Sequence, residues 1–358
     1  MSDAMYMIGA MSGTSCDGLD LVLASFSHKN RWESKIIKAQ TFDYTRSWRE
    51  KLLQADQLSG VELMKLDADF GIFTADCILE FLSGLDAPIR SKIKAVASHG
   101  HTVFHQPEHG FTVQIGSGAH IAARTGIICV CDFRSTDVAA GGQGAPLVPF
   151  ADQELFGDFD ACLNLGGFAN VSFAHVGKRI AYDICPVNIV LNALSRKLGQ
   201  EFDAGGKLAA AGKIIESMLQ HLNDMDYYKL EAPKSLGKEF CDHQIFPLLD
   251  TYLNNHSLHS VMHTFVEHIA MQIAAAIKDR SQVLVTGGGA YNQFLIEKIK
   301  AYYQGKIIIP DNMLINFKEA LAFAFLGLCR LSNKINIFSS VTGSSNDHSG
   351  GAVYLPVK

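Results

Sequence analysis

The sequence predicts an α/β protein of two domains, each built on a version of the same unit. Its 358 residues are enough for about two domains with separate cores. Residues 7–25 and 161–173 each place a glycine-containing polar turn between two strand-length apolar runs. Later, residues 95–97 and 283–285 have buried-strand patterns that run directly into a glycine turn. Because both patterns recur in the same order, they predict a duplicated unit.

The first polar turn reads GTSCDGLD and spans residues 13–20. Its glycines would let backbone N–H groups approach an anion, and its hydroxyls would add donors. Asp17 and Asp20 would repel a phosphate unless a divalent cation such as Mg²⁺ lay between them. The turn therefore predicts either a phosphate site with Mg²⁺ or an ordinary tight hairpin whose polar side chains satisfy the turn backbone.

Composition excludes several classes of protein. The formal net charge is -5, and no local basic patch is found, so a nucleic-acid partner is not expected. No run approaches the ~20 apolar residues of a membrane span. The first residues resemble neither a secretory signal nor a transit peptide, so we expect a soluble, cytoplasmic protein. The eight scattered cysteines are expected to be reduced thiols and predict no zinc site.

Four histidines follow the strand at 95–97, within the segment SHGHTVFHQPEHG. The segment lacks the HExxH motif of a helical zinc site, so single histidines that face a polar ligand are favoured over a metal cluster. His99 comes directly after the strand, where open α/β sheets place their ligands, and is predicted to face a polar ligand. Gly116 and Gly118 suggest a dinucleotide motif, but Ile121 stands where its third glycine belongs.

Two charged residues stand out in the middle of the chain. Arg134 is the one cation of the irregular segment 132–152, and it suits either a carboxylate ligand or a surface ion pair. Asp183 ends a short strand and precedes a proline turn and a helical stretch. It suits either a general base or a cap for that helix.

Helices are predicted where apolar residues recur with helical spacing. Residues 48–85 and 261–277 show this pattern, and an Ala- and Leu-rich helix is expected over residues 317–329, which include Glu319. The last apolar run, within residues 341–358, could add a strand to the first domain.

Taken together, six segments in this order resemble one protein family, the 1,6-anhydro-N-acetylmuramic acid kinases. The segments are MSGTSCDGLD, SHGHTVFHQP, DFRSTDVAAGGQGAPLVP, LNLGGFANVS, YDICPVN and VTGGGAYN. This family belongs to the superfamily of actin, the hexokinases and acetate kinase. The resemblance covers nearly the whole chain.

The resemblance implies two ribonuclease-H-like domains of the actin-like ATPase type, with ATP and substrate in an interdomain cleft. Domain I would comprise residues 1–132 and about 340–358, and domain II residues 133–339. The implied reaction uses ATP, Mg²⁺ and water to convert 1,6-anhydro-N-acetylmuramic acid to N-acetylmuramic acid 6-phosphate in peptidoglycan recycling. The implied partners are this sugar and ATP, with no nucleic acid or membrane, and the family suggests a homodimer.

The resemblance also implies roles for particular residues. Asp183 would be the catalytic base, and Arg134 would hold the lactyl carboxylate of the sugar. His99, Asn188 and Glu319 are the other predicted substrate contacts. Asp17 and Asp20 would bind Mg²⁺ through the phosphates. The predicted ATP-binding residues are Gly13, Thr14, Ser15, Cys16, Asp17, Gly18, Leu19, Asp20, Gly166, Gly167, Asn170, Gly287, Gly288, Gly289 and Asn292.

The sequence departs from the family pattern in two places. Ile184, Cys185 and Val187 replace three positions of the usual Thr-Gly-Pro-Gly-Asn segment, and Cys16 and His101 stand where Leu and Gln are commoner. The first departure leaves open a kinase for a different amino sugar. A non-catalytic nucleotide-binding sensor of the same fold is the other alternative, although Asp183 and both glycine turns argue against it.

Overall fold

The computed structural model describes residues 4–13 and 15–357. Contacts between residues in space divide the chain into two compact units. Unit 1 comprises residues 1–156 and 317–358, and unit 2 comprises residues 157–316. The boundaries expected from the sequence differ from these, because residues 133–156 and 317–339 make their contacts within unit 1.

Unit 1 contains a six-stranded sheet with the strand order β13-β7-β4-β1-β2-β3. β1, β2 and β3 form an antiparallel meander, β4 runs parallel to β1, and β7 runs parallel to β4. The strands of this sheet are β1 (Met5–Ser12), β2 (Gly18–His28), β3 (Trp32–Asp43), β4 (Ile93–Ser98), β7 (Ile128–Cys131) and β13 (Ala352–Tyr354). β13 pairs antiparallel with β7, which confirms the strand expected from the last apolar run.

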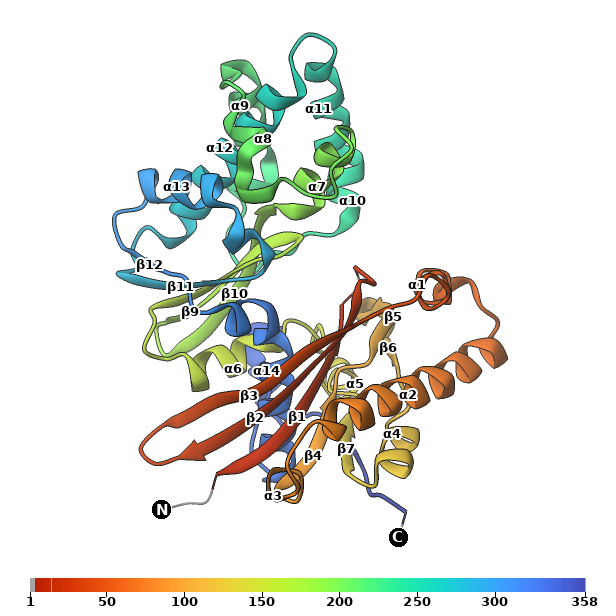
Figure 1. Ribbon diagram of the computed structural model, residues 1–358. Coiled ribbons are helices and arrows are strands. Elements are labelled where there is room, and N and C mark those ends of the chain that lie inside the picture. The colour runs from red at the N-terminus through yellow and green to blue at the C-terminus, as the bar shows by residue number, and fades with distance from the viewer. Residues whose placement is uncertain (1–3, 14, 358) are drawn as a thin grey trace. The chain divides into compact units, whose positions relative to one another are not determined.

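Helices cover both faces of this sheet (Figure 1). On one face, Ile78 and Phe81 of α2 and Ile121 of α4 pack in a core cluster with residues of β1, β2, β4 and β7. On the other face, α14 approaches so closely that a Cβ on Gly9 of β1 would lie 1.9 Å from the Ala320 carbonyl oxygen. A separate hairpin joins β5 (His101–Gln106) and β6 (Phe111–Ile115). The helices in the segments of unit 1 are α1 (Arg46–Leu53), α2 (Gly60–Ser83), α3 (Ala87–Arg90), α4 (Gly118–Thr125), α5 (Ser135–Ala139), α6 (Val148–Leu155), α14 (Asn312–Leu331, which begins in unit 2) and α15 (Ser339–Thr342).

Unit 2 repeats the arrangement with the order β10-β9-β8-β11-β12. Again the first three strands form an antiparallel meander, and β11 and β12 run parallel to the first. The strands are β8 (Ala161–Leu165), β9 (Phe168–His175), β10 (Lys178–Pro186), β11 (Gln282–Thr286) and β12 (Lys306–Ile308). The helices are α7 (Asn188–Arg196), α8 (Lys207–Ala210), α9 (Glu216–Asn223), α10 (Lys238–Phe240), α11 (Phe246–Leu253), α12 (Leu258–Ile277) and α13 (Gln293–Tyr302).

The five-strand order third–second–first–fourth–fifth, found in both units, is that of the ribonuclease-H-like fold, so the predicted fold class is confirmed. In each unit one of the two glycine turns joins the first and second strands. The two buried-strand patterns form the fourth strand of each unit, which is β4 in unit 1 and β11 in unit 2. α12 has the expected apolar stripe, since Val261, Phe265, Ile269 and Ile273, four residues apart, are fully buried in the unit 2 core.

Candidate functional site

The first predicted phosphate loop lies in unit 1, between β1 and β2. Its described residues form a tight turn in which the Cys16 N–H donates to the Gly13 carbonyl at 3.2 Å, and the Tyr44 N–H donates to the Asp17 carbonyl at 3.1 Å. Cys16 has a φ of 54°, the left-handed region. Thr14 was also predicted to contact ATP, but it lies outside the described residues.

The two acidic residues of this loop region have different surroundings. Asp17 is exposed, whereas Asp20 is half-buried in β2 and accepts a hydrogen bond from the Thr41 hydroxyl at 2.5 Å. Burial raises the pKa of Asp20, the Thr41 hydrogen bond opposes this, and the nearby charge of Asp17 adds to the rise. Residues 4–13 and 15–357 contain no group of three or more His, Cys, Asp or Glu side chains placed to hold a metal ion.

His99 and Arg134 form a pair at the carboxyl ends of β4 and β7. His99 is 4% exposed, and its Nδ1–H donates to the Gly100 carbonyl at 2.9 Å. Its Nε2 therefore accepts from Arg134, whose Nε and Nη2 lie at 3.1 and 2.9 Å. Burial and then the Arg134 charge hold the pKa of His99 well below its usual range, so the ring is neutral. The alternative that Arg134 makes only a surface ion pair is wrong.

Asp137 fixes the chain around this pair, although the sequence analysis did not select it. It is 0% exposed, its Oδ2 accepts from the Gly144 N–H at 2.7 Å, and its Oδ1 accepts from the Thr342 hydroxyl at 2.7 Å. Arg134 Nη1 in turn donates to the Gly144 carbonyl at 2.7 Å. No local signal in the sequence marks it, because polar and charged residues surround it in this segment and Thr342 lies 205 residues away.

Glu319, on α14, belongs to the same electrostatic environment. Surrounding protein raises the pKa of its carboxyl, and the charges of Arg134 and Lys318 oppose this, while the residue keeps more than a third of its surface open to solvent. Burial lowers the pKa of Arg134 to about 10, against the charges of Glu319 and Asp137, so Arg134 stays charged at neutral pH. Unit 1 thus brings His99, Arg134 and Glu319 together.

A polar cavity of about 260 Å³ borders this group in unit 1. His99 forms part of its wall, with Asp67, Thr112, Gln114, Asp132 and Ser135 among the other lining residues. Gln114 Oε1 is buried there without a hydrogen-bond partner. The cavity therefore offers unsatisfied hydrogen-bonding capacity beside a predicted substrate contact.

The second glycine turn, Gly166–Gly167 in unit 2, is braced by the start of α7. The Asn188 N–H donates to the Gly166 carbonyl at 3.2 Å, and the Val187 N–H donates to the Gly167 carbonyl at 2.8 Å. The Asn188 side-chain amide donates to the Leu165 carbonyl at 3.1 Å. Asn188 was predicted as a substrate contact, and that role stays a prediction. The structure places Asn188 against the second glycine turn.

The third glycine segment, Gly287–Gly289, lies beside the second. Gly287 has a φ of 82°, and a Cβ there would be 2.6 Å from the Asn164 side-chain oxygen. A Cβ on Gly289 would be 2.7 Å from the Leu165 Cβ. The two turns are thus packed together at the ends of β8 and β11. Asn292, which follows, uses its side-chain oxygen to cap α13 through the Leu295 N–H at 3.0 Å.

Asp183 lies on β10 and is half-buried. One of its carboxylate oxygens accepts the Leu236 N–H at 2.9 Å, and its own N–H donates to the Lys234 carbonyl at 3.2 Å. Burial raises the pKa of Asp183, and the Leu236 hydrogen bond opposes this. The alternative that Asp183 caps the following helix is wrong, because Val187 occupies the cap position of α7.

Asn170 connects Asp183 with the glycine turns. On β9 it pairs directly with Asp183 of β10 on one side and with Asn164 of β8 on the other. Directly paired residues of antiparallel strands place their side chains on the same face of the sheet. The predicted base and a predicted ATP contact are therefore neighbours in unit 2.

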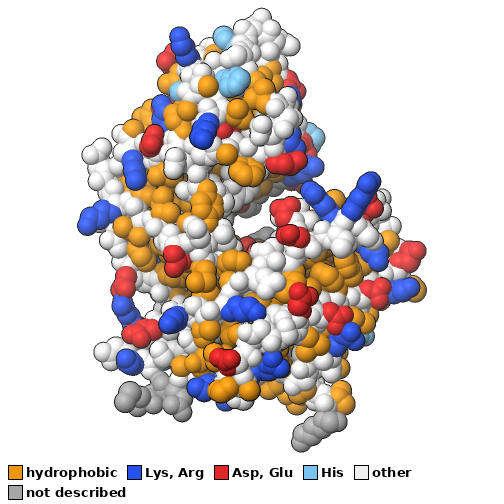
Figure 2. Space-filling view, viewed as in Figure 1, with side chains coloured by type: hydrophobic (Ala, Val, Ile, Leu, Met, Phe, Trp, Pro, Cys, Tyr) orange, Lys and Arg blue, Asp and Glu red, His pale blue; other side chains and the backbone are white. Residues whose placement is uncertain are grey.

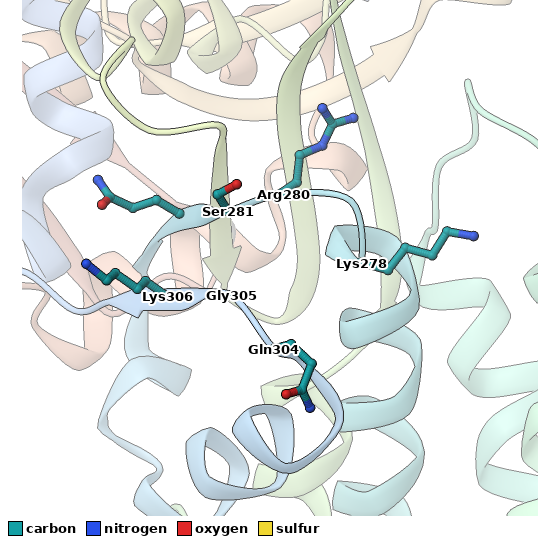
Figure 3. Close-up of a pocket in the computed structure, with 7 residues that line it drawn as sticks. Lys278, Arg280, Ser281, Gln304, Gly305 and Lys306 are labelled. Atoms are coloured by element: carbon teal, nitrogen blue, oxygen red, sulfur yellow. The ribbon is translucent and has the colours of Figure 1, made fainter.

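A larger hollow of about 500 Å³ in unit 2 does not have the character of a site. It is lined by Lys278, Arg280 and Lys306, but Figure 3 shows their side chains pointing away from one another. Arg280 instead lies over the Phe173 ring at 4.0 Å. On the face shown in Figure 2, basic and acidic side chains are interspersed, with no basic field of the kind that binds nucleic acid. None of the described helices is long and apolar enough to cross a membrane.

Comparison with known proteins decides the family. The sequence model of the anhydro-N-acetylmuramic acid kinases matches residues 5–356. The chain belongs to the anhydro-N-acetylmuramic acid kinase family. It is 34% identical to the anhydro-N-acetylmuramic acid kinase of Saccharophagus degradans, over 98% of each chain, and 34% identical to that of Vibrio cholerae, over 99% of this chain and 100% of the relative. The predictions of family and of a sugar kinase are confirmed.

Solved structures of more distant proteins also align with this anhydro-N-acetylmuramic acid kinase family member. One is the activator of the 2-hydroxyisocaproyl-CoA dehydratase from Clostridium difficile, at 13% identity and a TM-score of 0.45, covering 89% of this chain and 93% of that one. Another is a ROK family glucokinase from Streptomyces griseus, at 11% identity and a TM-score of 0.41, covering 90% and 98%.

Proposed function

We propose that this kinase opens 1,6-anhydro-N-acetylmuramic acid with water and phosphorylates its O6, giving N-acetylmuramic acid 6-phosphate for peptidoglycan recycling in the bacterial cytoplasm. The observation that carries the proposal is the setting of Asp183 within β10, a carboxylate of raised pKa that accepts the Leu236 N–H. A carboxylate that is held in this way and whose pKa is raised suits a general base. As the family suggests, the protein would act as a homodimer.

In the proposed reaction, Asp183 takes a proton from water as the water oxygen bonds to the anomeric carbon. The bond between that carbon and O6 breaks, and O6 takes the γ-phosphoryl group while ADP leaves. Arg134 would hold the lactyl carboxylate through its guanidinium, with His99 fixing the orientation of the fork. Positioning of this kind supplies most of the catalysis in phosphoryl transfer.

Each unit by itself offers backbone that suits a nucleotide. In unit 1, loop 13–17 would supply backbone N–H groups for the phosphates; in unit 2, Gly166–Gly167 and Gly287–Gly289 would let the nucleotide approach the backbone. Asp17 and Asp20 are oxygen donors near enough for the charge of one to raise the pKa of the other, which fits Mg²⁺. When bound with the phosphates, Mg²⁺ would neutralise part of their charge.

The alternative of a different amino sugar rests on Ile184, Cys185 and Val187. These side chains are 3%, 0% and 0% exposed and pack in the core of unit 2. Their bulk therefore fills the interior, and no observation on this segment favours another acceptor.

The reaction is tested by running it in ¹⁸O-labelled water with Mg²⁺-ATP and the anhydro-sugar. We expect a 6-phosphorylated product that carries one ¹⁸O atom at the anomeric hydroxyl, detected by mass spectrometry. A phosphorylated product without label would contradict hydrolytic ring opening, and no product from a folded sample would reject the substrate.

Replacing Gly288 by Ala tests the nucleotide site separately. A Cβ on Gly288 would meet only the Asn188 amide nitrogen, at 3.8 Å, so the free protein accommodates the methyl group. If the nucleotide lies against this backbone, the added methyl group should push it away and weaken its binding. A loss of about 1.4 kcal/mol in binding free energy would raise the Kd for ATP about tenfold. Calorimetric titration measures this, with the melting temperature expected to stay unchanged.

Gly60→Ala in α2 is the matched control, because a Cβ there has nothing within 4 Å. It should leave both the ATP affinity and the melting temperature as they are. Equal ATP affinities for Gly288→Ala and Gly60→Ala would remove Gly288 from the site.

A further inference from the structure

Four side chains form a hydrogen-bonded group beneath loop 13–17, and none of the roles described above uses them in this way. The Tyr44 hydroxyl donates to Ser12 Oγ at 2.7 Å, Ser12 Oγ lies 3.0 Å from His101 Nδ1, and His101 Nε2 lies 3.9 Å from Cys16 Sγ. Ser12, His101 and Cys16 are 1%, 3% and 2% exposed. The group joins the end of β1, the start of β5, the chain after β3 and the loop itself.

The proton positions in this group follow from counting donors. Burial lowers the pKa of His101 to about 4, so the ring is neutral and carries one N–H. One arrangement gives every hydroxyl and ring N–H of the group an acceptor within it. The Tyr44 O–H donates to Ser12, the Ser12 O–H donates to His101 Nδ1, and the His101 Nε2–H donates to the Cys16 sulfur.

Tyr44 also holds the other end of the loop. Its backbone N–H donates to the Asp17 carbonyl at 3.1 Å, while its hydroxyl holds Ser12, so one residue binds the chain on both sides of residues 13–16. Its ring packs against Phe70 and Phe73, with centroids 6.1 and 5.8 Å away. Cys16, with its φ of 54°, needs such support, because residues with a Cβ adopt this conformation only when their surroundings hold it.

We propose that Tyr44, Ser12, His101 and Cys16 are positioning residues that fix the described residues of this loop, 13 and 15–17, in the conformation needed to bind the phosphates of ATP. This inference rests on the proposed role of that loop. It also accounts for the two departures from the family pattern at Cys16 and His101, because the two residues contact each other and form one end of the group.

The proposal predicts that Tyr44→Phe raises the Kd for Mg²⁺-ATP about fivefold to tenfold, as the loss of one buried hydrogen bond would, and that Ser12→Ala, which removes two, raises it at least as much. Tyr252→Phe is the matched control, since the Tyr252 hydroxyl also lies near a histidine Nδ1, that of His221 at 2.8 Å, but in unit 2. His101→Gln, whose amide can both accept and donate, should keep the wild-type affinity, whereas His101→Leu should lose it.

The ¹⁵N spectrum of His101 gives a second readout that affinity alone does not. The wild-type ring should show the Nε2–H tautomer at pH 7, and Ser12→Ala should shift the ring toward a mixture of tautomers. Wild-type ATP affinity in folded Tyr44→Phe and Ser12→Ala, or an Nδ1–H tautomer in the wild type, would overturn the proposal. If the wild-type protein binds ATP but does not phosphorylate the anhydro-sugar, the proposed reaction fails while these comparisons still decide the role of the group.

Discussion

Replacing Asp183 by Asn should lower kcat by about 10²–10⁴-fold, the usual contribution of a positioned base. The amide has the shape of the carboxylate, so its oxygen can still accept the Leu236 N–H, but it cannot take a proton from water. ATP affinity, measured by calorimetry, should stay at the wild-type value. Steady-state kinetics with Mg²⁺-ATP and the anhydro-sugar measure the loss of kcat.

The pH profile identifies the base further. Because burial raises the pKa of Asp183, activity should increase with pH through a value above the ordinary range of aspartate, and Asp183→Asn should abolish this rise. The effect on stability has the opposite sign. The folded state binds this proton more tightly than the unfolded state, so the contribution to folding is present at low pH and is lost as pH rises through the raised pKa.

Asp226→Asn is the matched control, since its side chain is 97% exposed in unit 2 and pairs only with Lys229 in the contacts described. It should leave kcat and the pH profile unchanged. A folded Asp183→Asn enzyme with wild-type kcat would show that another group activates the water.

The sequence predicts the parts of this protein that depend on local chemistry. The two glycine turns and the strands before them are visible in short segments, whereas the expected end of a strand at Asp183 is wrong, because β10 continues to Pro186. The sequence shows the duplication only as a pattern that recurs in both halves. The structure confirms it, because the same five-strand order occurs in both units.

Long-range packing is what the sequence does not show. Within unit 1, Gly9 lets the backbone of Ala320 in α14 approach β1, and Gly327 of α14 lies equally close to Ala97 of β4. Nothing in residues 317–331 indicates that partner strand, so the expected domain boundary at about 340 differs from the observed one at 317. Asp137 escaped notice for a similar reason, because its partner Thr342 is 205 residues away.

Replacing Arg134 by Lys should raise the KM for the anhydro-sugar by about 10- to 100-fold, because a hydrogen bond to a charged group contributes about 1.5–3 kcal/mol. Lys keeps the charge but lacks the planar fork that contacts a carboxylate with two N–H groups. The substitution also loses contacts to His99 and the Gly144 carbonyl, so a change in KM alone would not separate recognition from local support.

The two roles separate when the substrate is changed together with the enzyme. 1,6-Anhydro-N-acetylglucosamine lacks the lactyl carboxylate, so the wild-type enzyme should use it far less well than the anhydro-muramic acid. If Arg134 binds that carboxylate, Arg134→Lys should reduce the preference for the anhydro-muramic acid over the anhydro-glucosamine. The enzyme change and the sugar change would then remove the same contact, so their effects would not add. Arg124→Lys, in an exposed pair with Asp76, should leave the preference unchanged. A preference retained in Arg134→Lys would mean that Arg134 only supports His99 and Gly144, and that another group binds the acid.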